Sequence, residues 1–258
     1  EGDIITSING TEIKAGMDWY PLLRMRGGKK MAITIKKGGK KEVEMYIEPA
    51  FTDVPQLYRR WVEQREKMVK ELSGGKIGYV HVEGMDTESF RTVYSDLLGK
   101  YRTCEAVIVD TRHNGGGWLH DDLATLLSGT GYIRFEPRGQ YIGTEPYNKW
   151  NKPSCVLIGE DNYSDAHGFP YVYKALEIGK LIGAPVPGTM TAVWWETLID
   201  NTIVFGIPQV GCVDMRGQYA ENNQLQPDIE VYNKPEDSLK GIDTQLATAV
   251  KEMLKTIK

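Results

Sequence analysis

Residues 107–117 read Val-Ile-Val-Asp-Thr-Arg-His-Asn-Gly-Gly-Gly, and this stretch decides the fold. An apolar run of strand length enters three consecutive glycines, and a helical pattern follows from residue 118. Glycines allow positive φ and let another group approach the backbone closely. The free amides of a helix start favour negative charge, so the bend suits a phosphate or a developing oxyanion, although a plain tight turn explains it as well. Neither the Walker pattern GxxxxGK[ST] nor the dinucleotide fingerprint GxGxxG is present.

A second apolar run ends in a serine at the start of a predicted helix. Residues 156–168 read Val-Leu-Ile-Gly-Glu-Asp-Asn-Tyr-Ser-Asp-Ala-His-Gly, which places Ser164 at the junction. A serine in this position is commonly a helix N-cap, and position alone favours that interpretation. The same position suits a nucleophile, because the Asp165 amide would lie beside the Ser164 hydroxyl and could hold an oxyanion.

A third motif places a carboxylate before a turn into a strand. Residues 220–229 read Ala-Glu-Asn-Asn-Gln-Leu-Gln-Pro-Asp-Ile, with Glu221 near the start. Taken by itself, this segment is typical of a surface loop.

Strand and helix patterns alternate through residues 76–258, which predicts one α/β unit. The apolar runs are Ile77–Val82, Ala106–Val109, Ser154–Ile158, Leu181–Ile182 and Ile203–Val210. The helical segments lie at about 86–100, 118–128, 165–179 and 243–257.

Residues 1–50 are predicted to be mainly β, and a helix follows them. The expected elements are a strand at Ile4–Ile8, a turn at Asn9-Gly10, a short helix at 16–26, strands at Met31–Lys36 and Glu42–Ile47 around a Gly38-Gly39 turn, and a polar helix at 55–73 that ends at Gly74-Gly75. The basic run at residues 36–41 is expected to be a solvated hairpin tip.

Composition limits the classes of function. The 258 residues are 41% hydrophobic, which is ordinary for a globular protein. Their formal net charge of −4 argues against a nucleic-acid or anionic-membrane partner. No apolar run approaches the ~18 residues of a membrane span. The three cysteines, Cys104, Cys155 and Cys212, have no zinc-ligand spacing and are expected to be buried free thiols.

Taken in order, the three motifs resemble the catalytic domain of the S41 peptidases, and the tricorn protease branch in particular. The resemblance covers about residues 76–258 and implies the α/β spiral of ClpP/crotonase-like proteins. Residues 1–48 resemble the second half of a PDZ domain, with Gly2-Asp3-Ile4-Ile5 and Ile8-Asn9-Gly10 as core pattern. The implied organisation is a partial PDZ-like domain at 1–50, a linker helix at 51–75 and a peptidase domain at 76–258.

The resemblance implies a role for five residues. Ser164 matches the nucleophile, and the Asp165 amide would supply one oxyanion donor. The glycine triplet would supply the other, from Gly117 first and Gly116 next, so the bend would stabilise a tetrahedral intermediate instead of binding phosphate. Glu221 matches the acid that, in this branch, steadies a serine that in turn orients the histidine base.

A sibling branch, the tail-specific processing peptidases, uses a Ser–Lys dyad. Its lysine follows the nucleophile in a Gly-Lys-Gly setting, whereas residues 186–191 read Val-Pro-Gly-Thr-Met-Thr. Lys180 lies upstream of that segment and is expected to be solvated. The dyad is therefore disfavoured.

The resemblance places the serine and histidine of the tetrad before the PDZ domain, so we expect this chain to be a fragment that is nearly inactive alone. The internal histidines are weak candidates for the base. His113 is expected to serve a loop or packing role, His81 to pack or face a neighbouring subdomain, and His120 and His167 to lie at the surface.

The resemblance further implies oligopeptide or unfolded polypeptide substrates, no metal and no organic cofactor. The implied partners are the N-terminal part of the same protein and copies of the chain in a homo-oligomer, while nucleic acid and membrane are not expected. The resemblance favours the cytoplasm, and a periplasmic or secreted location stays open. Residues 129–150 are expected to shape the substrate pocket. A non-catalytic peptide-binding protein is the main alternative, and an acyl-CoA enzyme is disfavoured by the Ser164-Asp165 pair.

Overall fold

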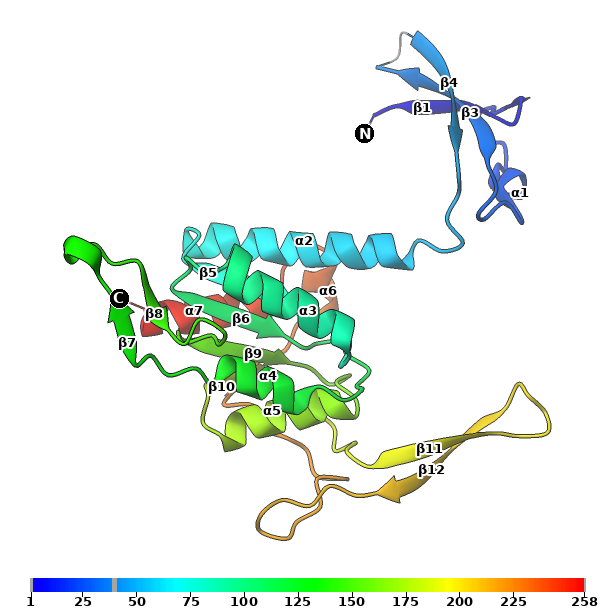
Figure 1. Ribbon diagram of the computed structural model, residues 1–258. Coiled ribbons are helices and arrows are strands. Elements are labelled where there is room, and N and C mark those ends of the chain that lie inside the picture. Colours follow the sequence, from blue (N-terminus) through cyan, green and yellow to red (C-terminus); the bar gives the residue numbers. More distant parts are fainter. Residues whose placement is uncertain (1, 39–40, 258) are drawn as a thin grey trace. The chain divides into compact units, whose positions relative to one another are not determined.

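The computed structural model describes residues 2–38 and 41–257. The chain divides into two compact units, Glu1–Trp61 and Val62–Lys258. The division falls inside helix α2 (Val54–Ser73), which is drawn in cyan in Figure 1.

The first unit is a four-stranded antiparallel sheet in the order β2-β1-β3-β4. Its strands are β1 (Ile4–Ile8), β2 (Thr11–Glu12), β3 (Met31–Lys37) and β4 (Lys41–Ile47). Alternate residues of β3 are buried, so Met31, Ile33 and Ile35 form a small core with Ile8. The predicted strands and the Asn9-Gly10 turn are confirmed, and both turn residues have positive φ. Gly39, in the predicted Gly38-Gly39 turn, and Lys40, in the basic tip, lie outside the described residues.

The helix predicted at 16–26 is much shorter than expected. Helix α1 spans only Tyr20–Leu23, with Pro21 in its first turn. Met25 adopts a positive φ of 58°, which a right-handed helix cannot continue through. Leu22 and Leu23 pack against the core of the unit, whereas Trp19 lies partly exposed and stacks on Tyr20.

The second unit is built on a five-stranded parallel sheet in the order β13-β10-β9-β6-β5. Its strands are β5 (Ile77–His81), β6 (Ala106–Asp110), β9 (Ser154–Ile158), β10 (Lys180–Gly183) and β13 (Ile229–Glu230). Four of the predicted apolar runs therefore form strands of this sheet. Every residue of β5, β6 and β9 is buried, as expected for parallel strands that are covered on both faces.

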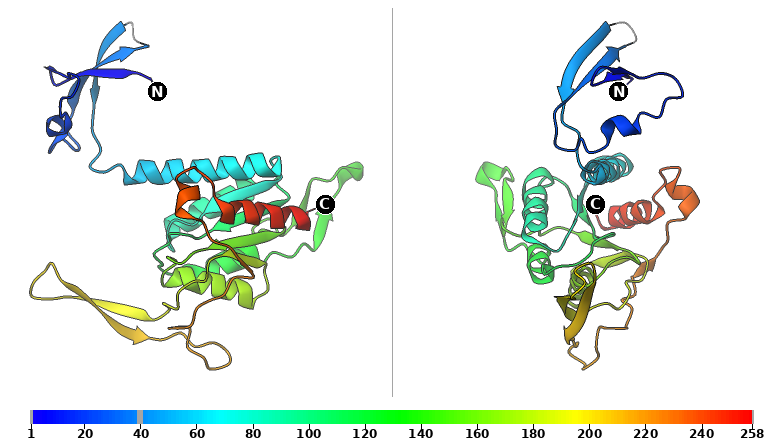
Figure 2. Two further views of the ribbon diagram at one scale, coloured as in Figure 1. Left: turned by 180° about the vertical axis from the view of Figure 1, so that it is seen from behind. Right: turned by 90° about the vertical axis from the view of Figure 1, so that its right-hand side faces the viewer.

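Helices cover both faces of the parallel sheet (Figure 2). One face packs against α3 (Thr87–Ser95), the π-helical turn η1 (Asp96–Lys100), α4 (His120–Leu127) and α5 (Asp165–Ala175). The other face packs against α2 and α7 (Thr244–Thr256). In β6, Val107 and Val109 contact the first layer while Ile108 contacts the second. A further short helix, α6 (Pro235–Ser238), follows β13. The three-layer arrangement confirms the predicted fold class at the level of α/β.

Residues 203–210 contain a strand as predicted, but the prediction was wrong in counting it among the strands that alternate with the helices of the α/β unit. Strand β12 (Val204–Val210) does not join the parallel sheet but pairs with β11 (Ala192–Thr197) in a separate hairpin (Figure 1). Trp194, Trp195 and Phe205 are each more than half exposed in the chain. An apolar run of strand length is buried only where another part of the protein packs against it. The sequence does not show whether another element packs against residues 203–210.

Residues 129–150 form a second hairpin from β7 (Ile133–Phe135) and β8 (Gly143–Glu145), with a 3₁₀ turn η2 (Pro137–Gly139) between them. Tyr147 lies under the guanidinium of Arg102, and Lys152 just beyond donates to the carbonyl of Cys104. Arg102 and Cys104 precede β6, so these contacts lie at the edge of the sheet where its strands begin. Ser164 follows the other end of β9, so the contacts of this segment with Arg102 and Cys104 lie away from it, and the expected role of residues 129–150 in shaping a substrate pocket stays a prediction.

A buried ion cluster ties the end of β6 to the start of α7. Arg112 is 3% exposed and contacts the carboxylates of Asp110, at 2.6 Å, and Asp243, at 3.0 Å. Asp110 also accepts a hydrogen bond from the hydroxyl of Tyr79. Asp243 caps α7 by accepting from the amide of Leu246. The cluster fixes the point where β6 turns into the glycine loop.

The structure also bears on membrane, metal and cysteine predictions. No helix among the described residues is long and apolar enough to cross a bilayer. The described part of the chain contains no group of three His, Cys, Asp or Glu side chains suited to a metal ion. All three cysteines are free thiols, but only Cys155 is buried, so the expected burial of Cys104 and Cys212 was wrong.

Candidate active site

Two loops meet where neighbouring parallel strands end. Asp110 at the end of β6 pairs with Leu157 near the end of β9. The loop after β6 carries the glycine bend, and the loop after β9 carries Ser164. In open α/β sheets this edge is where ligands usually bind.

Asn114 joins three loops at this edge. It is fully buried, its side-chain amide donates to the carbonyl of Val82 at 2.8 Å, and its Oδ1 accepts from the amide of Gly116 at 2.8 Å. Its own carbonyl accepts from the amide of Tyr163 at 3.1 Å. The residue before Ser164 is thus bonded directly to the glycine loop.

Asn162 performs a similar task within the serine loop. This buried side chain accepts from the amide of Gly159 and donates to the hydroxyl of Thr111 and the carbonyl of Ala166. Each of its polar atoms has a partner, as a buried amide requires. The path of the backbone through Ser164 is therefore held from both sides.

Ser164 adopts an unusual backbone conformation, with φ 54° and ψ −120°. Serine rarely occupies this region, and such strain persists only where the surrounding structure enforces it. Ser164 takes the N-cap position of α5, but its side chain makes no capping hydrogen bond. Ser164 therefore occupies the N-cap position with its backbone, but its side chain does not cap the helix. Within the described residues no hydrogen bond involves the half-buried Ser164 hydroxyl.

The glycine bend lies directly against Ser164. A Cβ on Gly116 would lie 2.7 Å from the Cβ of Ser164 and 3.0 Å from the amide nitrogen of Asp165. A Cβ on Gly117 would lie 2.2 Å from the carbonyl oxygen of Met85. Both glycines have positive φ, 92° and 143°. The structure thus brings together four of the five predicted site residues, Gly116, Gly117, Ser164 and Asp165, and only glycine fits the bend.

The amides of these residues differ in availability. The Gly116 amide donates to Asn114 and is not free. Across the described ranges, no hydrogen bond is found for the amides of Gly117 or Asp165. Gly117 is therefore a better candidate than Gly116 for an amide donor to a bound group.

Replacing Gly116 with alanine should displace Ser164, because the new Cβ would overlap the Cβ of Ser164 and the carbonyl of Tyr163. We expect the rate of covalent reaction at Ser164 in the full-length protein to fall about 100-fold, since about 1 Å of misplacement costs that much. Gly115→Ala is the matched control, because its Cβ would meet nothing within 4 Å. Equal reaction rates in the two variants would contradict the close contact.

Glu221 lies in a separate loop, after β12, and its side chain contacts the segment that precedes β11. Its Oε2 accepts from the amides of Met190 and Thr191, each at 2.8 Å. Burial tends to raise the pKa of Glu221, but hydrogen bonds from Thr191 and the Met190 amide outweigh burial, so its pKa lies below the usual value. The side chain is therefore an ionised hydrogen-bond acceptor at neutral pH.

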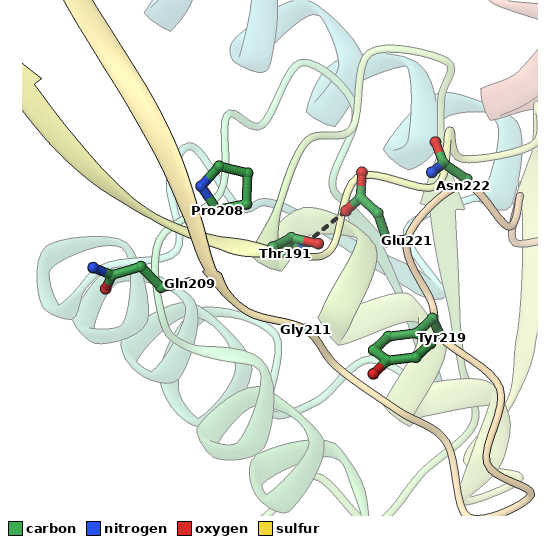
Figure 3. Close-up of a pocket in the computed structure, with 7 residues that line it drawn as sticks. All are labelled: Thr191, Pro208, Gln209, Gly211, Tyr219, Glu221 and Asn222. Atoms are coloured by element: carbon green, nitrogen blue, oxygen red, sulfur yellow. Dashed lines mark hydrogen bonds between the residues drawn. The ribbon is translucent and has the colours of Figure 1, made fainter.

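Glu221 also lines a pocket of about 450 Å³ at the root of the β11–β12 hairpin (Figure 3). The lining residues are Thr191, Pro208, Gln209, Gly211, Tyr219, Glu221 and Asn222. The segment 187–191 connects this pocket with Ser164, because the Ser164 amide lies 3.4 Å from the hydroxyl of Thr189. Ser164 and Glu221 thus contact the same short segment. The sequence contained no signal for Thr189.

Two of the histidines differ from the sequence-based expectation. His167, expected at the surface, is 1% exposed and its Nδ1 lies 3.2 Å from the carbonyl oxygen of Pro187. Burial lowers the pKa of His167, although the Pro187 carbonyl and the charge of Glu221 act in the opposite direction. His120, also expected at the surface, is largely buried and its Nδ1 lies 2.5 Å from a carboxylate oxygen of Asp165.

The other two histidines and Lys180 agree with expectation. His81 is buried with its Nε2 2.8 Å from the carbonyl oxygen of Arg112, and burial lowers its pKa. His113 is an exposed loop residue that pairs with Asp161, which raises the pKa of the imidazole. Lys180 starts β10, is exposed, and pairs with Glu252 at the opposite edge of the sheet from Ser164.

With this geometry established, comparison with known proteins identifies the family. The sequence model of peptidase family S41 matches residues 76–231, which is more than half of the chain. This chain belongs to peptidase family S41.

Among S41 peptidases, the chain is tricorn-like. It is 28% identical over 259 residues to the tricorn protease of Thermoplasma acidophilum, covering 100% of this chain and 24% of that protein. It is 28% identical over 251 residues to tricorn protease homolog 1 of Streptomyces coelicolor, covering 96% of this chain and 23% of that protein. The crystal structure of the tricorn protease superposes with a TM-score of 0.89 at 26% identity, covering 98% of this chain and 25% of that one. The chain thus spans about a quarter of the length of these relatives.

Proposed function

We propose that this S41 chain carries the nucleophile and oxyanion hole of a serine peptidase that cleaves oligopeptides or unfolded polypeptides. The observation that carries the proposal is the conformation of Ser164, whose backbone is strained and whose hydroxyl is unbonded within the described structure. A serine at the sharp junction between a parallel strand and a helix presents its hydroxyl at the ligand-binding edge of the sheet. A structural N-cap would instead use that hydroxyl for capping.

In the proposed reaction, the Oγ of Ser164 attacks the scissile carbonyl and a histidine removes the hydroxyl proton. The negative charge on the tetrahedral intermediate is held by the amides of Asp165 and Gly117. The histidine returns the proton to the leaving amine, and water then releases the acyl group from Ser164. Asp165 and Gly117 are chosen because their amides have no other partner in the described structure, whereas the Gly116 amide is occupied.

We propose that the base belongs to a tricorn-type Ser-His-Ser-Glu tetrad whose Ser-His half lies upstream of residue 1, with Ser164 and Glu221 as its other half. This agrees with the histidines of the chain, since no hydrogen bond joins any of the four to the Ser164 hydroxyl in the described part. Glu221 is ionised and could accept from a serine hydroxyl with its second oxygen. Under this scheme the chain alone is nearly inactive.

A fluorophosphonate tests the proposal, because it phosphonylates activated serines. We expect the full-length protein to be labelled at Ser164, as located by mass spectrometry of its peptides, and the isolated chain to be labelled far more slowly. Full-length protein that binds peptides but resists labelling would be a non-catalytic peptide-binding protein on the same fold. Rapid labelling and peptide turnover by the isolated chain would contradict the upstream base.

The finer organisation is also a proposal. We infer a partial PDZ-like domain at 1–50, a linker helix at 51–75 and a ClpP/crotonase-like peptidase domain at 76–258. The partners would be the N-terminal part of the same protein and further copies of it in a homo-oligomer. The antiparallel sheet of the first unit and the parallel sheet of the second support a boundary between them.

A further inference from the structure

The carboxylate of Asp165 makes contacts that its proposed role does not require. Its amide is the proposed oxyanion donor, yet its side chain is 3% exposed and faces the start of α4. Oδ2 accepts from the amides of Leu119, at 2.5 Å, and His120, at 3.1 Å, and Oδ1 lies 2.5 Å from Nδ1 of His120. Leu119 holds the N-cap position of α4 and has no capping side chain of its own. A carboxylate from α5 therefore caps α4.

These contacts fall just after the glycine bend. Gly117 is followed by Trp118, Leu119 and His120, so the carboxylate holds the second and third residues after the proposed donor. Met85 holds both neighbours of Gly117, because the Met85 amide donates to the Gly116 carbonyl and the Trp118 amide donates to the Met85 carbonyl. The Gly117 amide lies between two fixed points.

We propose that Asp165 and His120 form a positioning pair that sets the separation of the two oxyanion amides, a role that rests on the proposed function above. One residue, Asp165, supplies a donor through its backbone and holds the other donor loop through its side chain. His120 fixes the rotamer of that carboxylate through Nδ1. A negative carboxylate at the first turn of α4 also compensates the helix dipole, which a simple cap would do equally well. The proposed pair differs from a simple helix cap in that it also sets the geometry of the oxyanion hole.

Oxyanion donors act in the transition state, so a positioning role predicts a specific kinetic pattern. In the full-length protein, His120→Ala should lower kcat for peptide hydrolysis and the fluorophosphonate rate about 10- to 100-fold, while KM changes less than about threefold. His120→Asn should recover most of the loss, because its amide can donate to the same carboxylate oxygen. Asp122→Ala is the control, since this exposed acidic residue lies in the first turn of α4 and, in the described part of the chain, no hydrogen bond or ion pair joins its side chain to either loop.

The outcomes separate this inference from the function on which it rests. Loss in kcat with rescue by His120→Asn supports the pair. His120→Ala that reacts at the wild-type rate, or that loses activity through KM alone, overturns the pair and leaves Ser164 as nucleophile. Should His120→Ala unfold, Asp165→Asn provides the second test, since asparagine keeps an acceptor for the two amides and loses the carboxylate oxygen facing His120. Wild-type protein that resists phosphonylation overturns the proposed function and the pair together.

Discussion

Replacing Ser164 with alanine in the full-length protein is expected to lower kcat/KM for peptide hydrolysis at least about 10⁴-fold, as removal of a serine nucleophile does in other peptidases. The alanine keeps the backbone amide of Asp165 and the contact of Cβ with Gly116, so only the hydroxyl is lost. Peptide binding should therefore persist while turnover disappears. Steady-state kinetics on fluorogenic peptides, together with equilibrium binding of the same peptides, measures both quantities.

Ser128→Ala is the matched control for this experiment. Ser128 is an exposed serine at the end of α4 whose hydroxyl donates to the carbonyl of Thr125. Its loss should change kcat/KM by no more than about twofold, since surface substitutions have small effects. If Ser164→Ala kept a tenth of wild-type turnover, another residue would have to be the nucleophile.

Replacing Arg112 with leucine should destabilise the chain by about 3–5 kcal/mol, because it leaves the buried Asp110 carboxylate without its cation and removes one of the two arginines that pair with Asp243. Asp110 is fully buried and Asp243 is 3% exposed, and both contact the Arg112 guanidinium. Burial acts to raise the pKa of Asp110, but the charge and hydrogen bonds of Arg112 lower it to about 2. Without Arg112 the Asp110 carboxylate would have to ionise without its cation or take up a proton, and both cost free energy.

Urea unfolding at neutral pH measures this loss as a lower midpoint at unchanged slope. Arg134→Ala provides the comparison, because Arg134 forms an exposed ion pair with Glu136 on the β7–β8 hairpin and should change stability by at most about 1 kcal/mol. A loss below about 1 kcal/mol for Arg112→Leu would mean that the buried cluster is replaceable. Activity losses in this variant would follow from the displaced glycine loop.

The parallel sheet was predictable from the sequence, because strands covered on both faces appear as continuous apolar runs. Runs such as Ala106–Val109 and Ser154–Ile158 fell inside β6 and β9 almost to the residue. The structure adds that β6 and β9 are neighbours, so the glycine bend and Ser164 lie at the same edge of the sheet. The glycine bend and the serine loop could therefore be located from local pattern, whereas the roles of nucleophile and oxyanion donors came from the family resemblance.

Other features depend on contacts between distant residues and left no local pattern. The run at Ile203–Val210 has the composition of a buried strand, yet β12 lies in an exposed hairpin. His167 and His120 were assigned to the surface by helix position, but His167 is covered by the segment around Pro187 and His120 by Asp165. The contact between Asp165 and α4 spans 45 positions, so helix periodicity could not reveal it.

The proposed oxyanion donors are backbone N–H groups and not side chains. This limits which substitutions can remove them. No exchange of one side chain for another deletes a main-chain amide, except a change to proline. Substitution at Gly117 would therefore act through the path of the chain and leave the donor amide in place. At the glycine bend, inactivating substitutions would therefore be those that add a side chain, whatever the polarity of that side chain.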